Sequence, residues 1–598
     1  MAYTTIGMLI RQARKEKKGM TRQMLAKGIC SAQMLYHIEK DQAESDPLMI
    51  DMLIQRLGKS PDKLERILQA EMYRFVRVRD LLEKFVLKGR KGLAEYILQC
   101  YPERTNVDKM YRYRMRASFF YHFDKDYDKA LDSLYSAVYA TLPGFAYDTI
   151  DSYLISTVEM ENLLAIEKIN IEKKPSSEKL IEKEHLRICM AYIDSHFTDD
   201  EEHAKIYAKC AWLSARIAYC EGNYMQAMMF CENGMEGLRR NTMIYFMLPL
   251  LEIMVQCEDQ LGVISAFNKW RKHYDTLKFL WDFFPEKWHP AYEIFHNCYQ
   301  KEYHLDYELI RDERKAKGMT QEEFAEGIYQ NAASLSRFET GKKSPNRKTF
   351  ENMIEKLGMD KGRYNGYVVT DSFEVMALRS RVDMLQMRRR YADAQEILTE
   401  LKERLDMTVQ ENQMMVKFYE TMLATRLGAI TKQDALESMK QLLKGFMEYD
   451  KLVFNHVPMR NEVLIINSVC LVLSETGRKE EAERLFKGVL QRIRDSKIHI
   501  KYRYRSYGLL LNNYMCWFGE WNSAVEGLNY ALACGKASGI SLCLNNITKI
   551  LEKDGAEDKV IDRWSEAIYY MSDLFYFDKE KELFGKYLRE ERKIMILD

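Results

Sequence analysis

Proline and glycine are scarce in this chain, with 10 prolines and 28 glycines among 598 residues. These two residues interrupt helices most strongly, and no run of β-branched residues alternates as a strand would. Hydrophobic residues make up 47% and charged residues 30%, which supplies packed cores and excludes a disordered chain. We therefore expect an all-α protein of several domains.

Metal-binding and catalytic motifs are also missing. The twelve cysteines are scattered without a CxxC pair or a Cys/His cluster at ligand spacing, which favours small apolar packing residues in a reducing compartment. The chain contains no GxxxxGK[ST] loop, GxSxG elbow or HExxH pair. We expect no metal, no cofactor and no enzymatic activity.

Long apolar runs and an excess of one charge are absent as well. The stretch from Val463 to Leu473 is broken by Asn467 and Ser468 and is too short to span a bilayer. The N-terminus places apolar residues before basic ones, the reverse of a secretory signal, so we expect a cytoplasmic protein. A net charge of +1 means that any contact with DNA must be a local patch.

The most informative segment that is present runs from Thr320 to Pro345. Thr320 is placed to cap a short helix with acidic residues in its first turn, and Asn331 is placed to cap a second helix. The apolar residues of both helices are spaced to share one small core: Ala325, Ile328, Leu335 and Phe338. This pattern predicts a helix-turn-helix.

A weaker copy of the same unit lies at Met20 to Asp41, about half a chain earlier. Leu9-Ile10-Arg11 matches Leu309-Ile310-Arg311 at an offset of 300, and Arg90 and Ala94 match Arg390 and Ala394 at the same offset. The chain therefore reads as a tandem duplication, each half a small head followed by a long helical region.

Both copies resemble the Cro/C1-type (XRE) DNA-binding domain. The second copy keeps the pattern from Leu309 to Leu357 in register, whereas the first has Arg22 where the family usually has glutamine. The sequence GICS at Gly28 to Ser31 resembles more specifically that of the Rgg/PlcR-type peptide-pheromone regulators. The resemblance implies structural ion pairs from Arg14 to Glu39 and from Arg314 to Glu339.

A shorter pattern recurs in the helical regions: Gly222-x-Tyr224-x-x-Ala227, and again at Lys125, Gly477 and Gly519. It resembles the tetratricopeptide (TPR) repeat, in which an alanine lets paired helices approach closely. We expect two helix-turn-helix domains, each followed by a TPR-like α-solenoid. The expected domains are 1–70, 71–304, 305–368 and 369–598.

DNA-binding chemistry can be assigned to residues of each head. In the second head we expect phosphate contacts from Gln321, Lys342, Lys343, Arg347 and Lys348 and base contacts from Ala332, Ala333, Ser334, Ser336 and Arg337. In the first head the corresponding residues are Arg22 for phosphate and Ala32, Gln33, Met34, Tyr36 and His37 for bases. The alternative is that Tyr36 and His37 are surface residues without a role in DNA binding.

An acidic run from Asp41 to Asp46 follows the recognition helix of the first head. It lies where the DNA phosphates should pass and would repel them.

Asparagines interrupt apolar helical stretches of the second half, at Asn467, Asn512, Asn513, Asn545 and Asn546. A carboxamide both donates and accepts, and the resemblance to the pheromone regulators implies that such residues hold a peptide backbone. A buried asparagine that satisfies a neighbouring turn is the alternative.

Together these features predict a DNA-binding transcriptional regulator controlled by a peptide or protein ligand on its solenoid. Its partners would be double-stranded DNA and a signalling peptide or protein, and it would act as a single-chain pseudo-dimer or as a homodimer. The alternative is a TPR interaction scaffold whose heads are vestigial or bind other partners.

Overall fold

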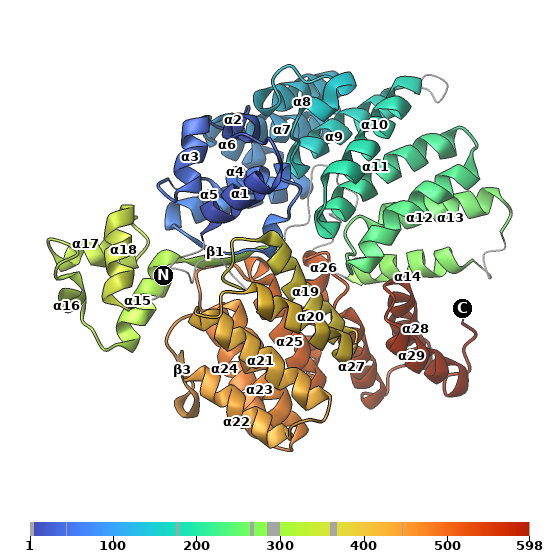
Figure 1. The fold of residues 1–598 in the computed structure, drawn as a ribbon. Coiled ribbons are helices and arrows are strands. Elements are labelled where there is room, and N and C mark those ends of the chain that lie inside the picture. The colour runs from blue at the N-terminus through green and yellow to red at the C-terminus, as the bar shows by residue number, and fades with distance from the viewer. Residues whose placement is uncertain are drawn as a thin grey trace.

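The structure is a computed structural model that describes residues 5–43, 45–174, 179–263, 268–283, 300–358, 368–444 and 446–596. Helices dominate it, as the scarcity of proline and glycine predicts, and they are arranged as two small heads and two helical solenoids (Figure 1). Every helix in the described part of the chain is too short or too polar to cross a membrane.

The first half begins with a head and continues as a solenoid of paired helices. The head comprises α1 (Ile6–Glu16), α2 (Arg22–Ala26), α3 (Ala32–Glu39), α4 (Pro47–Arg56), a short 3₁₀ helix η1 (Pro61–Lys63) and strand β1 (Glu65–Leu68). The first solenoid comprises α5 (Ala70–Leu87), α6 (Lys91–Cys100), α7 (Asn106–Phe119), η2 (Phe120–Asp124), α8 (Tyr127–Thr141), η3 (Tyr147–Ser152), α9 (Thr157–Lys173), α10 (Leu180–His196), α11 (Asp200–Cys220), α12 (Tyr224–Arg240), α13 (Met247–Gln260) and α14 (Lys269–Phe283).

The second half repeats this order. Its head comprises strand β2 (Glu302–Leu305), α15 (Asp306–Ala316), α16 (Gln321–Ala325), α17 (Ala332–Glu339) and α18 (Arg347–Lys356). The second solenoid comprises α19 (Phe373–Met387), α20 (Tyr391–Arg404), α21 (Gln410–Arg426), α22 (Lys432–Leu443), β3 (Met447–Glu448), η8 (Tyr449–Lys451), β4 (Val453–Phe454), α23 (Arg460–Glu475), α24 (Lys479–Arg494), η9 (Ile500–Tyr502), α25 (Tyr504–Phe518), α26 (Trp521–Ala533), α27 (Ile540–Lys553), α28 (Asp558–Leu574) and α29 (Asp578–Glu590).

The recurring alanine pattern marks pairs of packed helices. In each pair the fourth residue of the second helix is a completely buried alanine: Ala130, Ala227, Ala482 and Ala524. Gly222 and Gly477, in two of the turns before these helices, have φ of 77° and 84°, a left-handed conformation that glycine adopts at little cost. The small side chain lets the two helix axes approach, as the sequence predicts.

The two solenoids meet through equivalent turns. Met243 and Lys536 form an antiparallel bridge, in which the N–H of Ile244 donates to the carbonyl of Gly535 at 2.9 Å and the N–H of Ala537 donates to the carbonyl of Thr242 at 2.8 Å. Each turn precedes a helix whose N-cap residue is left-handed, Phe246 before α13 and Gly539 before α27. Met243 and Lys536 each lie three residues before the cap, and the donor and acceptor residues also lie at the same distance from the cap in both turns. The contact is therefore isologous about a pseudo-twofold axis.

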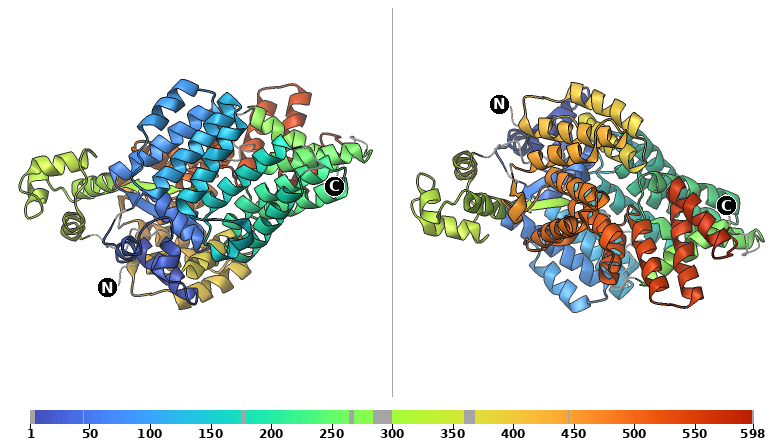
Figure 2. Two further views of the ribbon diagram at one scale, coloured as in Figure 1. Left: turned by 90° about the horizontal axis from the view of Figure 1, so that it is seen from above. Right: turned by 90° about the horizontal axis from the view of Figure 1, so that it is seen from below.

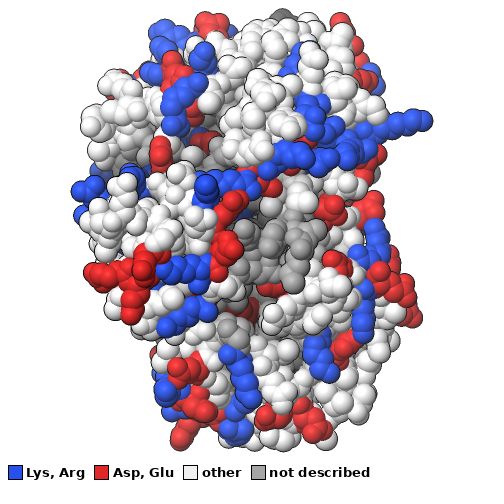
Figure 3. All heavy atoms as spheres, turned by 60° about the vertical axis from the view of Figure 1, so that its left-hand side comes forward, with Lys and Arg blue, Asp and Glu red and all other residues white. Residues whose placement is uncertain are grey.

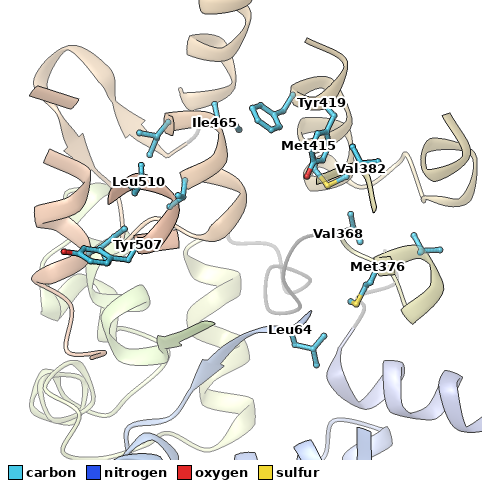
Figure 4. Packing of buried hydrophobic residues seen from close by; sticks show 14 of the residues in the cluster. Leu64, Val368, Met376, Val382, Met415, Tyr419, Ile465, Tyr507 and Leu510 are labelled. Carbon is cyan, nitrogen blue, oxygen red and sulfur yellow. The ribbon is translucent and has the colours of Figure 1, made fainter. Parts of the chain in front are cut away.

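Apolar packing also joins the first head to the second half. Leu64, which follows η1, lies beside Val368 and Met376 at the start of the second solenoid, and all three belong to one buried cluster (Figure 4). The same cluster continues through Ile465 and Leu510 of α23 and α25. The core of the first head is therefore continuous with the second solenoid.

A parallel strand pair, which the sequence did not predict, lies at the centre of the molecule. β1 pairs with β2 from Glu65↔Glu302 to Leu68↔Leu305. β1 leads out of the first head, whereas β2 leads into the second head, so the paired strands do not occupy equivalent places in the two halves. This contact departs from the pseudo-twofold symmetry of the solenoids.

The two heads are also placed differently. In all the ribbon views the second head, α15 to α18, projects from one end of the molecule, while the first head lies against the solenoids (Figures 1 and 2).

Candidate nucleic-acid interface

Each head is held together by a buried ion pair. In the first head Arg14 Nε lies 2.6 Å from Glu39 Oε1, and its Nη2 donates to Oε2 at 3.0 Å. In the second head the Arg314–Glu339 distances are 2.6 and 2.9 Å. Because both carboxylates are almost fully buried, the pair fixes the third helix of the head to its first. Both predicted ion pairs are confirmed.

The expected phosphate ligand at the start of the second helix contacts the same carboxylate. Gln321 Nε2 donates to Glu339 Oε2 at 2.7 Å, and Arg22 Nε donates to Glu39 Oε2 at 2.6 Å. The guanidinium of Arg22 also lies over the ring of Tyr36, 5.1 Å from its centroid. These side chains orient the helix start, and their remaining N–H groups are what a phosphate would contact.

The recognition helix of the second head, α17, is capped as predicted by Asn331, whose side chain accepts from the N–H of Ser334 at 3.1 Å. Leu335 and Phe338 are buried on its inner face, while Ala333 and Arg337 are exposed. Ala332, Ser334 and Ser336 are half-buried between them. The helix therefore presents one face of small and hydrogen-bonding side chains, and its one arginine can donate two hydrogen bonds to a guanine.

All four basic residues after α17, Lys342, Lys343, Arg347 and Lys348, are exposed. Arg347 differs from the lysines because it pairs with Glu351 at 2.7 Å and lines a cleft between the two heads. Burial raises the pKa of Asp41 in this cleft, and the positive charge of Arg347 partly opposes that rise. Basic and acidic side chains are interspersed over this end of the molecule (Figure 3), so a DNA contact would rest on a local patch.

The recognition helix of the first head, α3, carries side chains that bond to one another. Gln33 Nε2 lies 2.9 Å from His37 Nε2, and His37 Nδ1 lies 3.0 Å from Gln42 Oε1. Since an amide nitrogen only donates, this geometry fits the neutral Nδ1–H tautomer of His37. Ala32 and Gln33 are exposed, and Met34, Tyr36 and His37 are half-buried. The oxygen of Gln33 stays available to a base.

The acidic run of the first head is used internally. Asp46 caps α4 by accepting from the N–H of Leu48 at 2.8 Å, and Arg79 of α5 donates to its two oxygens at 2.6 and 2.7 Å. The hydroxyl of Thr5 donates to Asp41. Glu44 lies outside the described residues. Partnered carboxylates repel phosphate less than the free run that the sequence suggested.

The first head is clamped onto its own solenoid. Gly28, with φ of 78°, lies so close to α8 that a Cβ would stand 1.9 Å from the carbonyl oxygen of Thr141. Arg56, at the end of α4, is 1% exposed and donates to Glu159 of α9 at 3.1 Å and to the carbonyl of Thr141 at 3.1 Å. The counterpart of Gly28 is Gly327, and no described atom lies within 4 Å of a Cβ built there.

The second head docks through a different surface. Its first helix, α15, contacts the second solenoid through Glu308, which accepts from Ser496 Oγ at 2.7 Å, and through Glu313. His456 bridges the carboxylates of Glu313 and Glu462, with distances of 2.6 and 2.7 Å. Glu462 belongs to the capping box at the start of α23, as Glu159 belongs to the capping box at the start of α9. The first head contacts this site on its solenoid through Arg56 of α4, whereas the second head contacts it through Glu313 of α15 and His456. The two heads therefore dock through different faces.

One buried cluster has the composition of a metal site. Ligand atoms of Glu65, Glu302 and His304 lie within 4.8 Å of one another. The guanidinium of Arg503 lies among them, with Nη1 at 2.8 Å from His304 Nε2 and Nε at 3.6 Å from Glu302. Burial and this guanidinium lower the pKa of His304 to about 4. The cation already present makes the cluster an ion-pair network rather than a place for a metal.

The asparagines of the second solenoid divide into three kinds. Asn513 of α25 donates to Asn467 of α23 at 2.9 Å, and among the described residues the amide nitrogen of Asn467 and the amide oxygen of Asn513 have no further hydrogen bond. Asn512 packs against Gly539, and Asn546 donates to the carbonyl of Leu542 in its own helix at 3.0 Å. Asn545 is half-buried on α27. The amide of Asn546 is therefore partly satisfied within its own helix.

Residues 10–64 and 310–362 both match the family described as Helix-turn-helix. Both heads are helix-turn-helix domains. The two matched segments cover the capped helices, the buried ion pairs and the exposed recognition helices described above.

Two solved structures are similar to about half of the chain. The complex of Bacillus thuringiensis PlcR with the peptide PapR7 and DNA is 17% identical, covers 47% of this chain and 98% of its own, and has a TM-score of 0.31. ComR from S. thermophilus, in complex with DNA and its signalling peptide ComS, is 14% identical, covers 47% and 97%, and has a TM-score of 0.29. No curated protein matches the chain.

Proposed function

We propose that this protein is a sequence-specific DNA-binding transcriptional regulator in which one chain supplies both heads. The observation that carries the proposal is the pairing of two helix-turn-helix domains, each with an accessible recognition helix, with an isologous contact between the halves. Dimeric regulators with such heads read two half-sites about one DNA turn apart, and the duplication supplies the two heads within a single chain.

In this proposal the second head contributes most of the affinity. Exposed Lys342, Lys343 and Lys348 neutralise phosphates, and Arg337 reads a base. In the first head Gln33 is the best base reader, because its amide oxygen remains available to the amino group of adenine. We assign Arg347 a smaller part because it is paired with Glu351.

We further propose that a peptide regulates the protein by binding along α23 and α25. The support is the Asn467–Asn513 pair, whose remaining donor and acceptor lie on the first helices of successive pairs. A peptide main chain offers the complementary carbonyl and N–H.

A second candidate function gives DNA binding to the second head alone. The clamp at Gly28 and Arg56 and the apolar packing at Leu64 make the first head part of the body of the molecule. Two chains would then contribute one working head each, and the first head would be a structural or partner-binding unit.

Chromatin immunoprecipitation with sequencing in the host tests the function as a whole. A regulator gives a limited set of sharp peaks that share a motif, and a scaffold gives none. Substituting Arg337 by alanine in the same strain is the control, because peaks that depend on base reading by the second head should be lost or weakened.

Selection of linear peptides displayed on ribosomes against the full chain tests the peptide site. Peptides that bind at α23 and α25 should lose affinity for Asn513→Ala and keep it for Asn546→Ala, since Asn546 bonds only within its own helix. Peptides that bind both variants equally would remove the asparagine pair from this role.

A further inference from the structure

The recognition helix of the first head, α3, ends in a turn that brings two polar side chains together. The N–H of Asp41 donates to the carbonyl of Ile38 at 2.9 Å, and the N–H of Gln42 donates to the carbonyl of His37 at 2.7 Å. Asp41 has a φ of 53°, so this pair of bonds is the Schellman ending of a helix. Such an ending places the side chain of Gln42 beside that of His37.

The second head has the same main-chain ending with different side chains. The N–H of Gly341 donates to the carbonyl of Phe338 at 2.7 Å, and the N–H of Lys342 donates to the carbonyl of Arg337 at 2.9 Å. Lysine and arginine side chains only donate, so Lys342 and Arg337 cannot bond to each other. Arg337 can therefore donate directly to a base, whereas His37 has a partner in Gln42.

In the first head three side chains form a hydrogen-bonded relay. Gln42 Oε1 lies 3.0 Å from His37 Nδ1, and His37 Nε2 lies 2.9 Å from Gln33 Nε2. An amide oxygen only accepts and an amide nitrogen only donates. The imidazole therefore donates through Nδ1–H to Gln42 and accepts at Nε2 from Gln33, so the acceptor at Gln42 sets the direction of the relay.

His37 is also held by a contact from the rest of the head. The ring of Tyr36 meets the imidazole edge to face, with centroids 5.5 Å apart. The guanidinium of Arg22 lies over the ring of Tyr36, and Arg22 Nε donates to the buried carboxylate of Glu39 at 2.6 Å. These contacts join the imidazole to the buried ion pair and restrict the rotation of its ring.

The direction of the relay decides which atoms of Gln33 remain for a base. One N–H of the amide is used by His37, which leaves the amide oxygen and the second N–H. Adenine presents an amino group beside N7, and this oxygen and N–H match the two groups. In the opposite direction the amide oxygen and nitrogen would exchange places. An N–H would then stand where the oxygen was, which suits O6 of guanine or O4 of thymine.

We propose that Gln42 and His37 determine the base that the first head selects, by fixing Gln33 in the orientation that reads adenine. The inference rests on the proposed function, because it requires α3 to lie in a major groove. Both are positioning residues, since they act through Gln33 and need not touch the base. The sequence of the second head, with Ala333, Arg337 and Lys342 at these positions, provides no such relay.

Selection of bound duplexes from a random pool by the full chain tests the relay, at about pH 8.5 so that histidine is neutral. Gln42→Leu removes the acceptor and should lower the preference for adenine over guanine at the base read by Gln33 by about threefold to tenfold, the effect of one hydrogen bond. Gln42→Glu keeps an acceptor and should retain the preference, although its charge weakens binding to all sequences. The half-site of the second head is the internal control and should be unchanged in both variants.

A base analogue tests the same contact from the DNA side. Replacing the selected adenine by purine, which lacks the amino group, should weaken binding of the unaltered chain by about threefold to tenfold and binding of Gln42→Leu by less than about twofold. Melting temperatures show that the variants are folded. An unchanged adenine preference in Gln42→Leu, or a loss of preference in Gln42→Glu, would overturn the relay alone. If the unaltered chain selects no half-site for the first head, base reading by that head is wrong, and the relay fails with it.

Discussion

Met243 and Lys536 pair across the middle of the molecule at positions that correspond in the two halves. The reciprocal hydrogen bonds beside them, from Ile244 to Gly535 and from Ala537 to Thr242, are what two identical subunits would make about a twofold axis. The chain therefore contains, within itself, an interface of the kind that other proteins form by dimerisation.

A single chain should occupy a complete operator. We expect one 598-residue monomer to protect a DNA site of about 20 base pairs or more with two unlike half-sites, because Gln33 and Arg337 cannot read the same base. Footprinting combined with light scattering of the complex measures the site and the stoichiometry. A palindromic site covered by two chains, touched only by their second heads, would contradict the single-chain arrangement.

Arg337 and Lys342 should contribute in different ways. Arg337→Ala should weaken binding to the selected site by about 1 to 3 kcal/mol and leave binding to scrambled DNA nearly unchanged, because it removes a base contact. Lys342→Ala should weaken both alike, because it removes a phosphate contact. Gel-shift titrations on both duplexes give the four affinities. Equal losses for Arg337→Ala would exclude base reading.

The salt dependence should come largely from the exposed lysines of the second head. Replacing Lys342, Lys343 and Lys348 together by alanine should reduce the slope of log affinity against log salt by up to roughly 2.7, at about 0.9 per phosphate. Replacing Lys553, Lys559 and Lys586 of the second solenoid is the matched control and should leave the slope unchanged. The same loss in both triple variants would indicate a general effect of charge.

Glu339→Gln should destabilise the second head. The carboxylate is 3% exposed and accepts from both Arg314 and Gln321, so its neutralisation leaves a buried guanidinium without its counter-ion. Losing one partner of a buried pair costs about 3 to 5 kcal/mol. Glu351→Gln, in a half-exposed pair, should cost no more than about 1 kcal/mol. Thermal unfolding followed by circular dichroism compares them, and equal melting temperatures would show that the Arg314 pair is energetically unimportant.

Acidification should loosen the docking of the first head. Burial, with a smaller contribution from Lys17, lowers the pKa of His196 to about 4, and this ring contacts the carbonyl of Arg56 at 2.9 Å. Above the unfolded pKa of about 6.5 both states are neutral; below it only the unfolded histidine binds a proton, so stability is lost as pH falls from 6.5 to 4. His196→Gln should therefore flatten the fall of the melting temperature over this window. An unchanged pH profile would show that His196 has no part in it.

Local features of the heads were predictable from the sequence, and the arrangement of the heads was not. Thr320 and Asn331 cap their helices as expected because a cap depends only on residues three positions apart. The buried alanines of the helix pairs follow from an equally short pattern. The strand pair of Glu65 with Glu302 depends on residues far apart in sequence, and each strand has only four residues, too few to give a strand signal.

The partners of charged residues also could not be predicted from the sequence of one motif. Asp46 looked like a free acid in an acidic loop, yet Arg79, from the next domain, donates to both of its oxygens. Likewise, nothing in the first copy of the motif indicates that Gly28 lies against Thr141, because the neighbour that requires a glycine is 113 residues away. Such contacts are set by docking between domains, which the residues of one motif do not encode.

The isologous contact within one chain also changes how the protein can evolve. In a homodimer every substitution is made twice, so a change that suits one half-site is imposed on the other. Here Met34 and Ser334, at corresponding places in the two recognition helices, are encoded separately and have already diverged. Under the proposed function, one gene can therefore follow an asymmetric operator one half-site at a time, because the two recognition helices are joined in one chain and are always present in equal number.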